Sequence, residues 1–220
     1  MTQEHGLGRL PAPDARDQRF LMRAVMGAPP TLPAYRHYKC GAVLDQGPHP
    51  HCVGYAWRQW LASAPLMTRT GPQPQIIYHA AQQVDEWPGD AYAGTSVRAG
   101  AKVLVSLGHV ASYVWAFTAE DVATWLLSGH GSVVAGTVWT SGMMRPNDKG
   151  FIAPIGGIVG GHAYLIIGYN RVSGVFRLVN SWARSWGDNG RAWILGEHLD
   201  ALIRDGGEAC TAHEQHHTKG

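Results

Sequence analysis

The sequence predicts an α+β fold built from two different lobes. Its first half carries apolar residues at helical spacing, and its second half carries β-branched and aromatic runs between glycines. Helices and strands that are segregated in this way are typical of α+β proteins rather than of alternating α/β sheets. At 220 residues the chain is long enough for one domain, or for two small lobes that share a core.

Amphipathic segments predict four helices in the first half and a fifth near the end. They cover residues 52–64, 74–84, 95–108, 118–128 and 197–204. Thr95 or Ser96 caps the third, and Thr118 with Asp121 resembles a capping box for the fourth. The strands are expected over residues 132–139, 163–169, 175–180 and 192–195, with a further extended segment over 35–43.

Composition divides the chain into an arm, a domain and a tail. Residues 1–34 are rich in Pro, Arg, Asp and Gly and predict a loosely held arm, partly disordered, in which residues 20–26 dock as a short helix or strand. The domain is expected over residues 35–210, with a mainly helical lobe over about 46–115 and a mainly β lobe over about 116–200. Residues 211–220 read as a polar tail.

The bulk properties exclude several classes of protein. A net charge of +2 is too small to indicate a nucleic acid or a membrane surface as partner. The sequence has neither a transmembrane run nor a secretory signal, so we expect a cytoplasmic protein, or one in the host cytoplasm or virion if a phage encodes it. Three cysteines favour unpaired thiols over a disulfide framework, with a Cys40–Cys210 bridge as the alternative.

Cys52 is the candidate nucleophile, because it follows a Pro-rich loop and stands at the predicted start of a helix. A free cysteine has a pKa near 8.5 and is only a few per cent thiolate at neutral pH. A helix N-terminus and a nearby imidazolium both stabilise the anion. A reactive thiol is therefore expected at this position, provided that a histidine reaches it from elsewhere in the chain.

Residues far apart in the sequence can supply the partners of such a thiol. His162 follows a Gly-Gly pair and precedes an apolar run, so its ring is expected at the start of a buried strand, as base and acid. Asn180 is expected to hydrogen-bond the far ring nitrogen, with Trp182 covering that bond. Gln46 lies six positions before Cys52 and is expected to donate to an oxyanion, together with the Cys52 backbone N–H.

Three stretches together resemble the papain family of cysteine peptidases. They are Gln46-Gly-Pro-His-Pro-His-Cys52, Gly161-His162-Ala163 and Asn180-Ser-Trp-Ala-Arg-Ser-Trp186-Gly-Asp-Asn-Gly190. Val53-Gly-Tyr-Ala and Gly94-Thr-Ser-Val-Arg are similar to the bacterial and phage branch of that family. The resemblance covers roughly residues 35–210 and implies a papain-like two-lobe fold, with a helical left lobe, a β-barrel right lobe and the active-site cleft between them.

The resemblance also assigns roles. It implies a nucleophile at Cys52, a general base and acid at His162, an orienting residue at Asn180 and an oxyanion donor at Gln46. It implies that a peptide substrate is bound by Gly94, Thr95, Gly160, Gly161 and Trp182. Gly160 matches a wall of the main specificity pocket, where a glycine leaves the pocket wide.

The sequence departs from the family pattern around the nucleophile. Val53 stands where an aromatic residue usually follows it, and His49 replaces a disulfide cysteine. Pro50-His51 replaces a small Gly-Ser step. Since no long inhibitory prosegment precedes the nucleophile, either residues 1–34 shield the cleft themselves or the protein is not stored as a zymogen.

We therefore expect a cysteine-type peptidase, a hydrolase that acts on a peptide or protein substrate and needs no cofactor or metal. His49 and His51 flank the nucleophile, but a His-x-His loop alone does not make a metal site. Two alternatives stay open. One is a catalytically weak or inactive papain-like module, for example in a phage particle, and the other is a thiol amidase that acts on cell-wall peptides.

Overall fold

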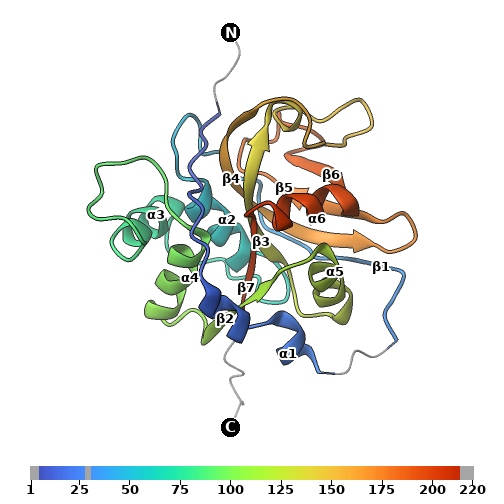
Figure 1. Cartoon of the computed structure of the whole chain (residues 1–220), viewed down its shortest axis with the longest axis horizontal. Helices are drawn as coiled ribbons and strands as arrows, with labels where there is room; N and C mark the ends of the chain where they lie inside the picture. The colour runs from blue at the N-terminus through green and yellow to red at the C-terminus, as the bar shows by residue number, and fades with distance from the viewer. Residues whose placement is uncertain (1–4, 28–30, 214–220) are drawn as a thin grey trace.

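The computed structural model describes residues 5–27 and 31–213 of the chain. It has a mixed architecture in which one antiparallel sheet carries helices on both sides (Figure 1). The strands are β1 (Tyr35–His37), β2 (Ser112–Ala116), β3 (Val133–Thr140), β4 (Ile158–Asn170), β5 (Val175–Val179), β6 (Arg191–Leu195) and β7 (Glu208–His213). Their order is β2-β7-β3-β4-β5-β6, with β1 paired to β4.

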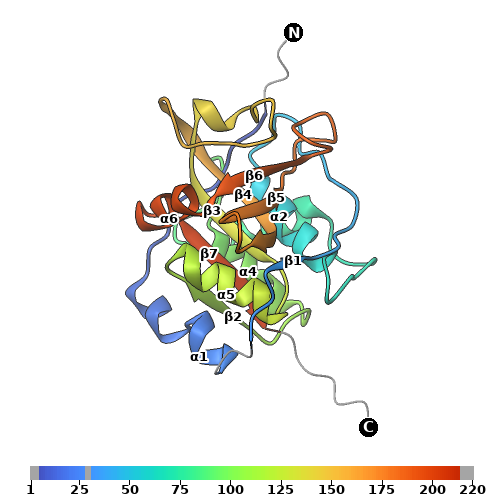
Figure 2. The same ribbon diagram turned by 90° about the vertical axis from the view of Figure 1, so that its right-hand side faces the viewer.

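The helices divide between the two sides of this sheet. They are α1 (Met22–Met26), α2 (Cys52–Leu61), α3 (Pro74–Gln82), α4 (Val97–Ser106), α5 (Ala119–Ser128) and α6 (Gly196–Arg204), with 3-10 turns at Ala15–Arg19 and Ser141–Met143. Helices α2 and α4 contact the sheet directly, and α3 packs on both of them. On the other side α5 and α6 cover the sheet, as the view in Figure 2 makes plain.

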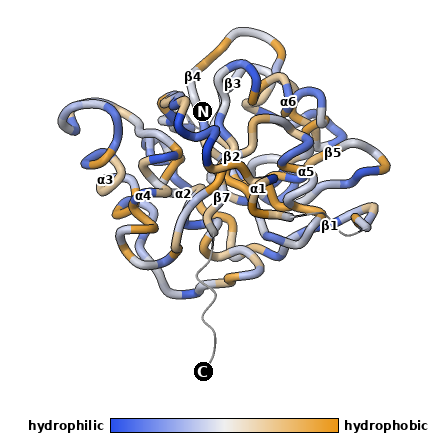
Figure 3. Tube along the Cα trace, turned by 60° about the horizontal axis from the view of Figure 1, so that its bottom comes forward, coloured by the Kyte–Doolittle hydropathy of each residue, from blue (hydrophilic) through white to orange (hydrophobic). Residues whose placement is uncertain are grey.

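Strand β4 joins the two sides because both of its faces are buried. Ala163, Leu165 and Ile167 belong to the hydrophobic cluster under α2 and α4. Tyr164 and Ile166 belong to the cluster under α5 and α6. Successive side chains of a strand point to opposite faces, so an unbroken apolar run is what a doubly covered strand requires. Hydrophilic residues gather instead in outer loops, such as the one beside α3 (Figure 3).

The predicted helices are confirmed with small differences at their ends. Helix α2 begins at Cys52 as expected, and α3 ends at Gln82, two residues early. Of the two candidate caps for α4, Ser96 is the one that accepts from the Ala99 N–H. The Thr118 hydroxyl caps α5 by accepting from Asp121 N. In the part of the chain that the structure describes, no helix has the length and apolar character needed to cross a membrane.

The α+β, papain-like fold class is confirmed, but four details of the prediction are wrong. The sheet is open, with β2 and β6 at its edges, so it is not a closed barrel. Strand β4 starts at Ile158, so His162 lies inside the strand and not at its start. Strand β2 was not predicted. Nor was β7, which takes in residues 211–213 of the expected tail; residues 214–220 lie outside the described residues.

The N-terminal arm also differs from the loose segment that its composition predicts. Arg9 and Met22 are buried, and the short helix α1 falls within the expected range 20–26. In Figure 1 the dark-blue segment runs across the front of the molecule, between the α2–α4 helices and the sheet. Residues 1–4 and 28–30 lie outside the described part of the arm.

Candidate active site

The Cys52 thiol lies at the first turn of α2, where this helix packs on β4. Cys52 is fully buried, and burial raises the pKa of its thiol to about 11. The backbone N–H groups of Ala163, Gly8 and Val53 act in the opposite direction. Ala163 directly follows His162, so the structure brings the thiol next to the strand that carries the candidate base.

His162 is held by Asn180 in a defined orientation. Its Nε2 atom lies 2.8 Å from Asn180 Oδ1. A carbonyl oxygen only accepts, so Nε2 carries the proton and donates it, which leaves a lone pair on Nδ1 of the neutral ring. Among the described residues His162 Nδ1 has no hydrogen-bond partner. The ring therefore has a free acceptor of the kind that a general base needs.

Two tryptophans enclose the imidazole. The His162 ring centroid lies 4.6 Å from that of Trp182 and 4.8 Å from that of Trp139. Burial lowers the pKa of His162 to about 4, while the hydrogen bond with Asn180 raises it and the charge of His5 lowers it further. Since both tryptophans are fully buried, they keep water away from the hydrogen bond that orients the ring.

Gln46 is fixed with its amide nitrogen directed at the arm. Its Oε1 accepts a 2.6 Å hydrogen bond from Ser181 Oγ, which settles which end of the amide is the donor. Its Nε2 donates to Gly6 O at 3.0 Å and to His49 O at 2.7 Å. Trp182 Nε1 donates to the same Gly6 oxygen at 3.3 Å. A peptide carbonyl of the arm thus occupies the donor that the sequence predicts for an oxyanion.

The arm crosses this site as an extended peptide. Gly8 O accepts from Thr95 N at 2.9 Å, and Leu10 N donates to Thr95 O at 2.9 Å. The N–H groups of Gly8 and Arg9 both donate to Gly161 O at 3.0 Å. The arm therefore uses the backbone positions that the resemblance assigns to a bound peptide.

Gly6 and Gly8 of the arm lie so close to the loop before Cys52 that neither position has room for a side chain. A Cβ atom on Gly6 would lie 2.0 Å from His49 O, and one on Gly8 would lie 2.1 Å from Pro50 O. Cβ atoms essentially never come so near to a backbone oxygen, so any side chain here would push the arm out of the site. The loop that departs most from the family pattern is thus the loop against which the arm packs.

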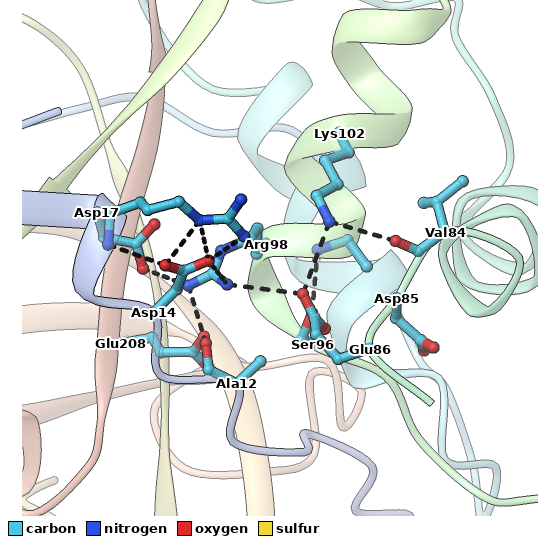
Figure 4. A network of polar contacts seen from close by, with 12 residues as sticks. Ala12, Asp14, Asp17, Val84, Asp85, Glu86, Ser96, Arg98, Lys102 and Glu208 are labelled. Carbon is cyan, nitrogen blue, oxygen red and sulfur yellow. Dashed lines mark hydrogen bonds and ion pairs between the residues drawn. The ribbon is translucent and has the colours of Figure 1, made fainter. Parts of the chain in front are cut away.

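A cluster of charges anchors the next part of the arm to α4 (Figure 4). Arg98 of α4 donates to Ala12 O at 2.8 Å and pairs with the carboxylates of Asp14 and Asp17. It also lies 3.6 Å from Glu86. Because the Arg98 side chain is only 5% exposed, these contacts are far less screened than those of a surface ion pair.

Seven of the nine predicted site residues contact the arm, and the other two lie behind one of these seven. The arm is contacted by Cys52, Gln46, Gly94, Thr95, Gly160, Gly161 and Trp182, and His162 with Asn180 lies directly behind Trp182. Their catalytic and substrate-binding roles stay predictions.

Sequence reasoning missed several residues of the site. Ser181, which fixes the Gln46 amide, stands in the Asn-Ser-Trp motif and could have been found there. Trp139 had no signal beyond its place in an apolar strand. The buried pair of Arg9 and Glu208 had none, because these residues are 199 positions apart and one of them opens an unpredicted strand.

Neither a disulfide nor a metal cluster is present in the described residues. Cys40, Cys52 and Cys210 are all free thiols. Across residues 5–27 and 31–213, no group of three or more His, Cys, Asp or Glu side chains is arranged to hold a metal ion. The rings of His49 and His51 stack on each other with their centroids 5.3 Å apart. This packing within the loop explains why the two residues lie side by side.

Fold and site together define the class of architecture: the chain has the fold of the papain-like cysteine proteases. Solved structures with this fold include xylellain, a cysteine protease from Xylella fastidiosa, with a TM-score of 0.73 at 17% identity over 98% of both chains. Bromelain from Ananas comosus, in complex with the E64 inhibitor, has a TM-score of 0.63 at 13% identity and covers 84% of this chain and 100% of its own.

Procathepsin L 3 from the larval midgut of Tenebrio molitor is a third such structure. It has a TM-score of 0.62 at 14% identity, over 96% of this chain and 76% of that one. No protein-family model and no curated protein matches the sequence. At these identities the likeness establishes the fold, and the activity must be argued from the site.

Proposed function

We propose that the protein is a cysteine peptidase that hydrolyses peptide bonds through Cys52, His162 and Asn180, with Gln46 as the oxyanion donor. One observation carries this function: an extended peptide, the arm, lies across the thiol with a carbonyl on the Gln46 amide. A site that binds backbone N–H and C=O groups in this manner suits a peptide substrate. The protease neighbours support the same reaction class.

In the proposed reaction His162 takes the proton of the Cys52 thiol as the sulfur attacks the carbonyl carbon of a substrate peptide. Gln46 Nε2 donates to the oxyanion that forms, and Asn180 keeps the imidazole aligned. His162 then gives the proton to the leaving amine, and the C–N bond breaks. His162 next accepts a proton from water, which hydrolyses the thioester and frees the thiol.

The proposal treats the arm-bound form as latent. The arm fills the peptide-binding backbone positions, and the Gly8 N–H that lies beside the sulfur favours the thiolate. Burial leaves the thiol pKa at about 11 and the imidazole pKa at about 4, so the pair is neutral near pH 7. Departure of the arm readmits solvent and substrate.

Labelling by an epoxide of the E64 type tests the proposal. The protein is the full chain carrying Gly6→Ala and Gly8→Ala, called the arm-opened variant below, because both substitutions clash with the 49–50 backbone. We expect one label, on Cys52 by mass spectrometry, and cleavage of peptide substrates. Cys52→Ala should abolish both, whereas Cys40→Ala, at a half-buried free thiol, should abolish neither.

Three outcomes would contradict the proposal or redirect it to one of the alternatives. Equal labelling with and without Cys52 would show that the thiol is not activated. Peptide binding without cleavage between pH 4 and pH 9 would favour the inactive binding module instead. Cleavage of purified cell-wall cross-peptides but not of casein would identify the thiol amidase.

A further inference from the structure

The side chain that the arm inserts most deeply next to the thiol is Arg9. Its Nε donates to Glu208 Oε2 at 2.9 Å, and its Nη2 donates to Gly206 O at 2.7 Å. The side chains are 2% and 8% exposed, so the ion pair is shut off from solvent. Arg9 also lies near enough to the Cys52 thiol for its charge to favour the thiolate. The buried space that Arg9 fills beside the nucleophile is called the Glu208 pocket below.

The walls of this pocket are shaped for a long side chain. A Cβ on Gly136 of β3 would lie 3.0 Å from Arg9 Cγ, and one on Gly161 of β4 would lie 2.1 Å from Arg9 O. Gly136 stands opposite Glu208 in the pairing of β3 with β7. The missing side chain of Gly136 leaves room for the stem of Arg9, and that of Gly161 lets the arm backbone approach β4, so the Arg9 side chain reaches the Glu208 carboxylate.

The carboxylate is not fully used by the arm. Among the described residues Glu208 Oε1 is buried without a hydrogen-bond partner. Burial raises the pKa of Glu208, while the charge of Arg9 and, to a smaller extent, that of Arg98 lower it. Loss of Arg9 removes the larger of these two compensating charges, which is unfavourable for a buried carboxylate. When a substrate replaces the arm, the pocket therefore favours a substrate that brings a cation back to it.

The backbone contacts of the arm indicate which side chain of a bound peptide enters this pocket. Gly161 O and Thr95 hold the arm backbone on either side of the Arg9 side chain. The same groups are expected to hold a substrate backbone, so one substrate side chain must enter where Arg9 now lies. This step rests on the proposed peptidase function.

We propose that Glu208 is the specificity-determining residue of the site, and that its pocket selects an arginine side chain of the peptide substrate. Arginine is favoured over lysine because the pocket offers two acceptors, the Glu208 carboxylate and the Gly206 carbonyl, to a planar fork of donors. A lysine ammonium group can pair with the Glu208 carboxylate, but it lacks the planar fork of donors that also reaches the Gly206 carbonyl.

The rival explanation makes Glu208 only a latch for the arm. A latch changes how often the cleft is open, but the arm competes equally with every substrate. The ratio of kcat/KM for two substrates on the same protein is then independent of the open fraction. The ratio separates the two roles, because only a specificity pocket changes it.

The test uses the full-length arm-opened variant and fluorogenic peptides with Arg, Lys, Leu or Phe at each of the three positions before the scissile bond. We expect one position to prefer Arg over Lys and Lys over Leu. Glu208→Gln should lower the Arg-to-Leu ratio of kcat/KM by about 30-fold or more, since it removes a buried charge partner. Glu208→Asp, which keeps the charge with a shorter reach, should lower it less. The exposed Glu120→Gln is the matched control and should leave the ratio unchanged.

Each outcome decides the proposal. Cleavage without a preference for Arg at any position, or an Arg preference that survives Glu208→Gln, overturns the role of Glu208 and leaves the peptidase function standing. If the arm-opened variant neither cleaves a peptide nor takes an epoxide label on Cys52, the peptidase function itself fails, and the specificity proposal falls with it.

Discussion

At the scale of single residues, the thiol and the imidazole respond to burial in opposite senses. Burial raises the pKa of Cys52 to about 11 and lowers the pKa of His162 to about 4, because in both cases it disfavours the charged form. The uncharged pair is thus the stable one while the arm excludes water. In the proposed peptidase, departure of the arm returns water to both groups and so removes the burial that disfavours their charged forms.

Gln46 gives a prediction at this scale. Its amide orientation is fixed by Ser181 before a substrate arrives, so it can donate to a developing oxyanion without reorganising. In the arm-opened variant, Gln46→Ala should lower kcat by about 100-fold to 1,000-fold and change KM little. Initial rates on one fluorogenic peptide measure both constants, with the exposed Gln83→Ala as control. A rise in KM with kcat unchanged would mean that Gln46 binds the ground state instead.

At the scale of elements, the sequence predicted the helices, which depend on neighbouring residues, better than the strands, which depend on distant ones. Helices α2, α4 and α5 were predicted from apolar stripes within each segment, and α4 and α5 also have side-chain caps next to their stripes. Strand β7 was missed, since its six residues alternate weakly and are defined by pairing with β2 and β3. The arm was misjudged for the same reason: a Gly- and Pro-rich segment looks loose until its partners, such as Thr95 and Gly161, are in place.

The arm itself carries the prediction at the element scale. Gly6→Ala with Gly8→Ala should speed both the alkylation of Cys52 by iodoacetamide at pH 7 and the cleavage of peptides, by about 10-fold for each 1.4 kcal/mol of arm affinity that is lost. The reason is steric, because each added Cβ would lie about 2 Å from a backbone oxygen.

Gly157→Ala is the matched control for the arm. A Cβ on Gly157 would meet nothing within 4 Å, and Gly157 does not need a positive φ. Its alkylation rate and activity should therefore equal those of the wild type. If all three proteins react at the same rate, the arm does not limit access to the thiol.

At the scale of the whole molecule, the site depends on contacts that no local pattern contains. The candidate nucleophile stands on α2 and the candidate base on β4, and the two residues are 110 positions apart along the chain. The motif resemblance named four polar residues; the structure places His162 against Asn180, the Cys52 thiol beside the Ala163 backbone, and Gln46 on the Gly6 carbonyl of the arm. The resemblance did not predict that the arm fills the site, nor that Arg9 pairs with Glu208. Both features depend on the N-terminal arm and the C-terminal strand β7 coming together beside β3.

The burial of His162 in the core links the site to the stability of the fold. Its pKa is about 4 in the folded protein and about 6.5 in an unfolded chain, so the unfolded state binds more protons between these two values. The stability from the neutral imidazole is fully present above pH 6.5 and is lost as pH falls towards 4. By linkage the loss is about 3 kcal/mol in the free energy of unfolding.

Urea unfolding of the full chain at pH 8, 6, 5 and 4 measures this loss. The His162→Gln variant is expected to lose less stability on acidification than the wild type, since its amide does not titrate. His51 should still contribute in both proteins, because burial lowers its pKa to about 4 as well. The same decline in both proteins would mean that the imidazole at 162 is not buried in its neutral form, and the argument for an enclosed, water-free base would fail with it.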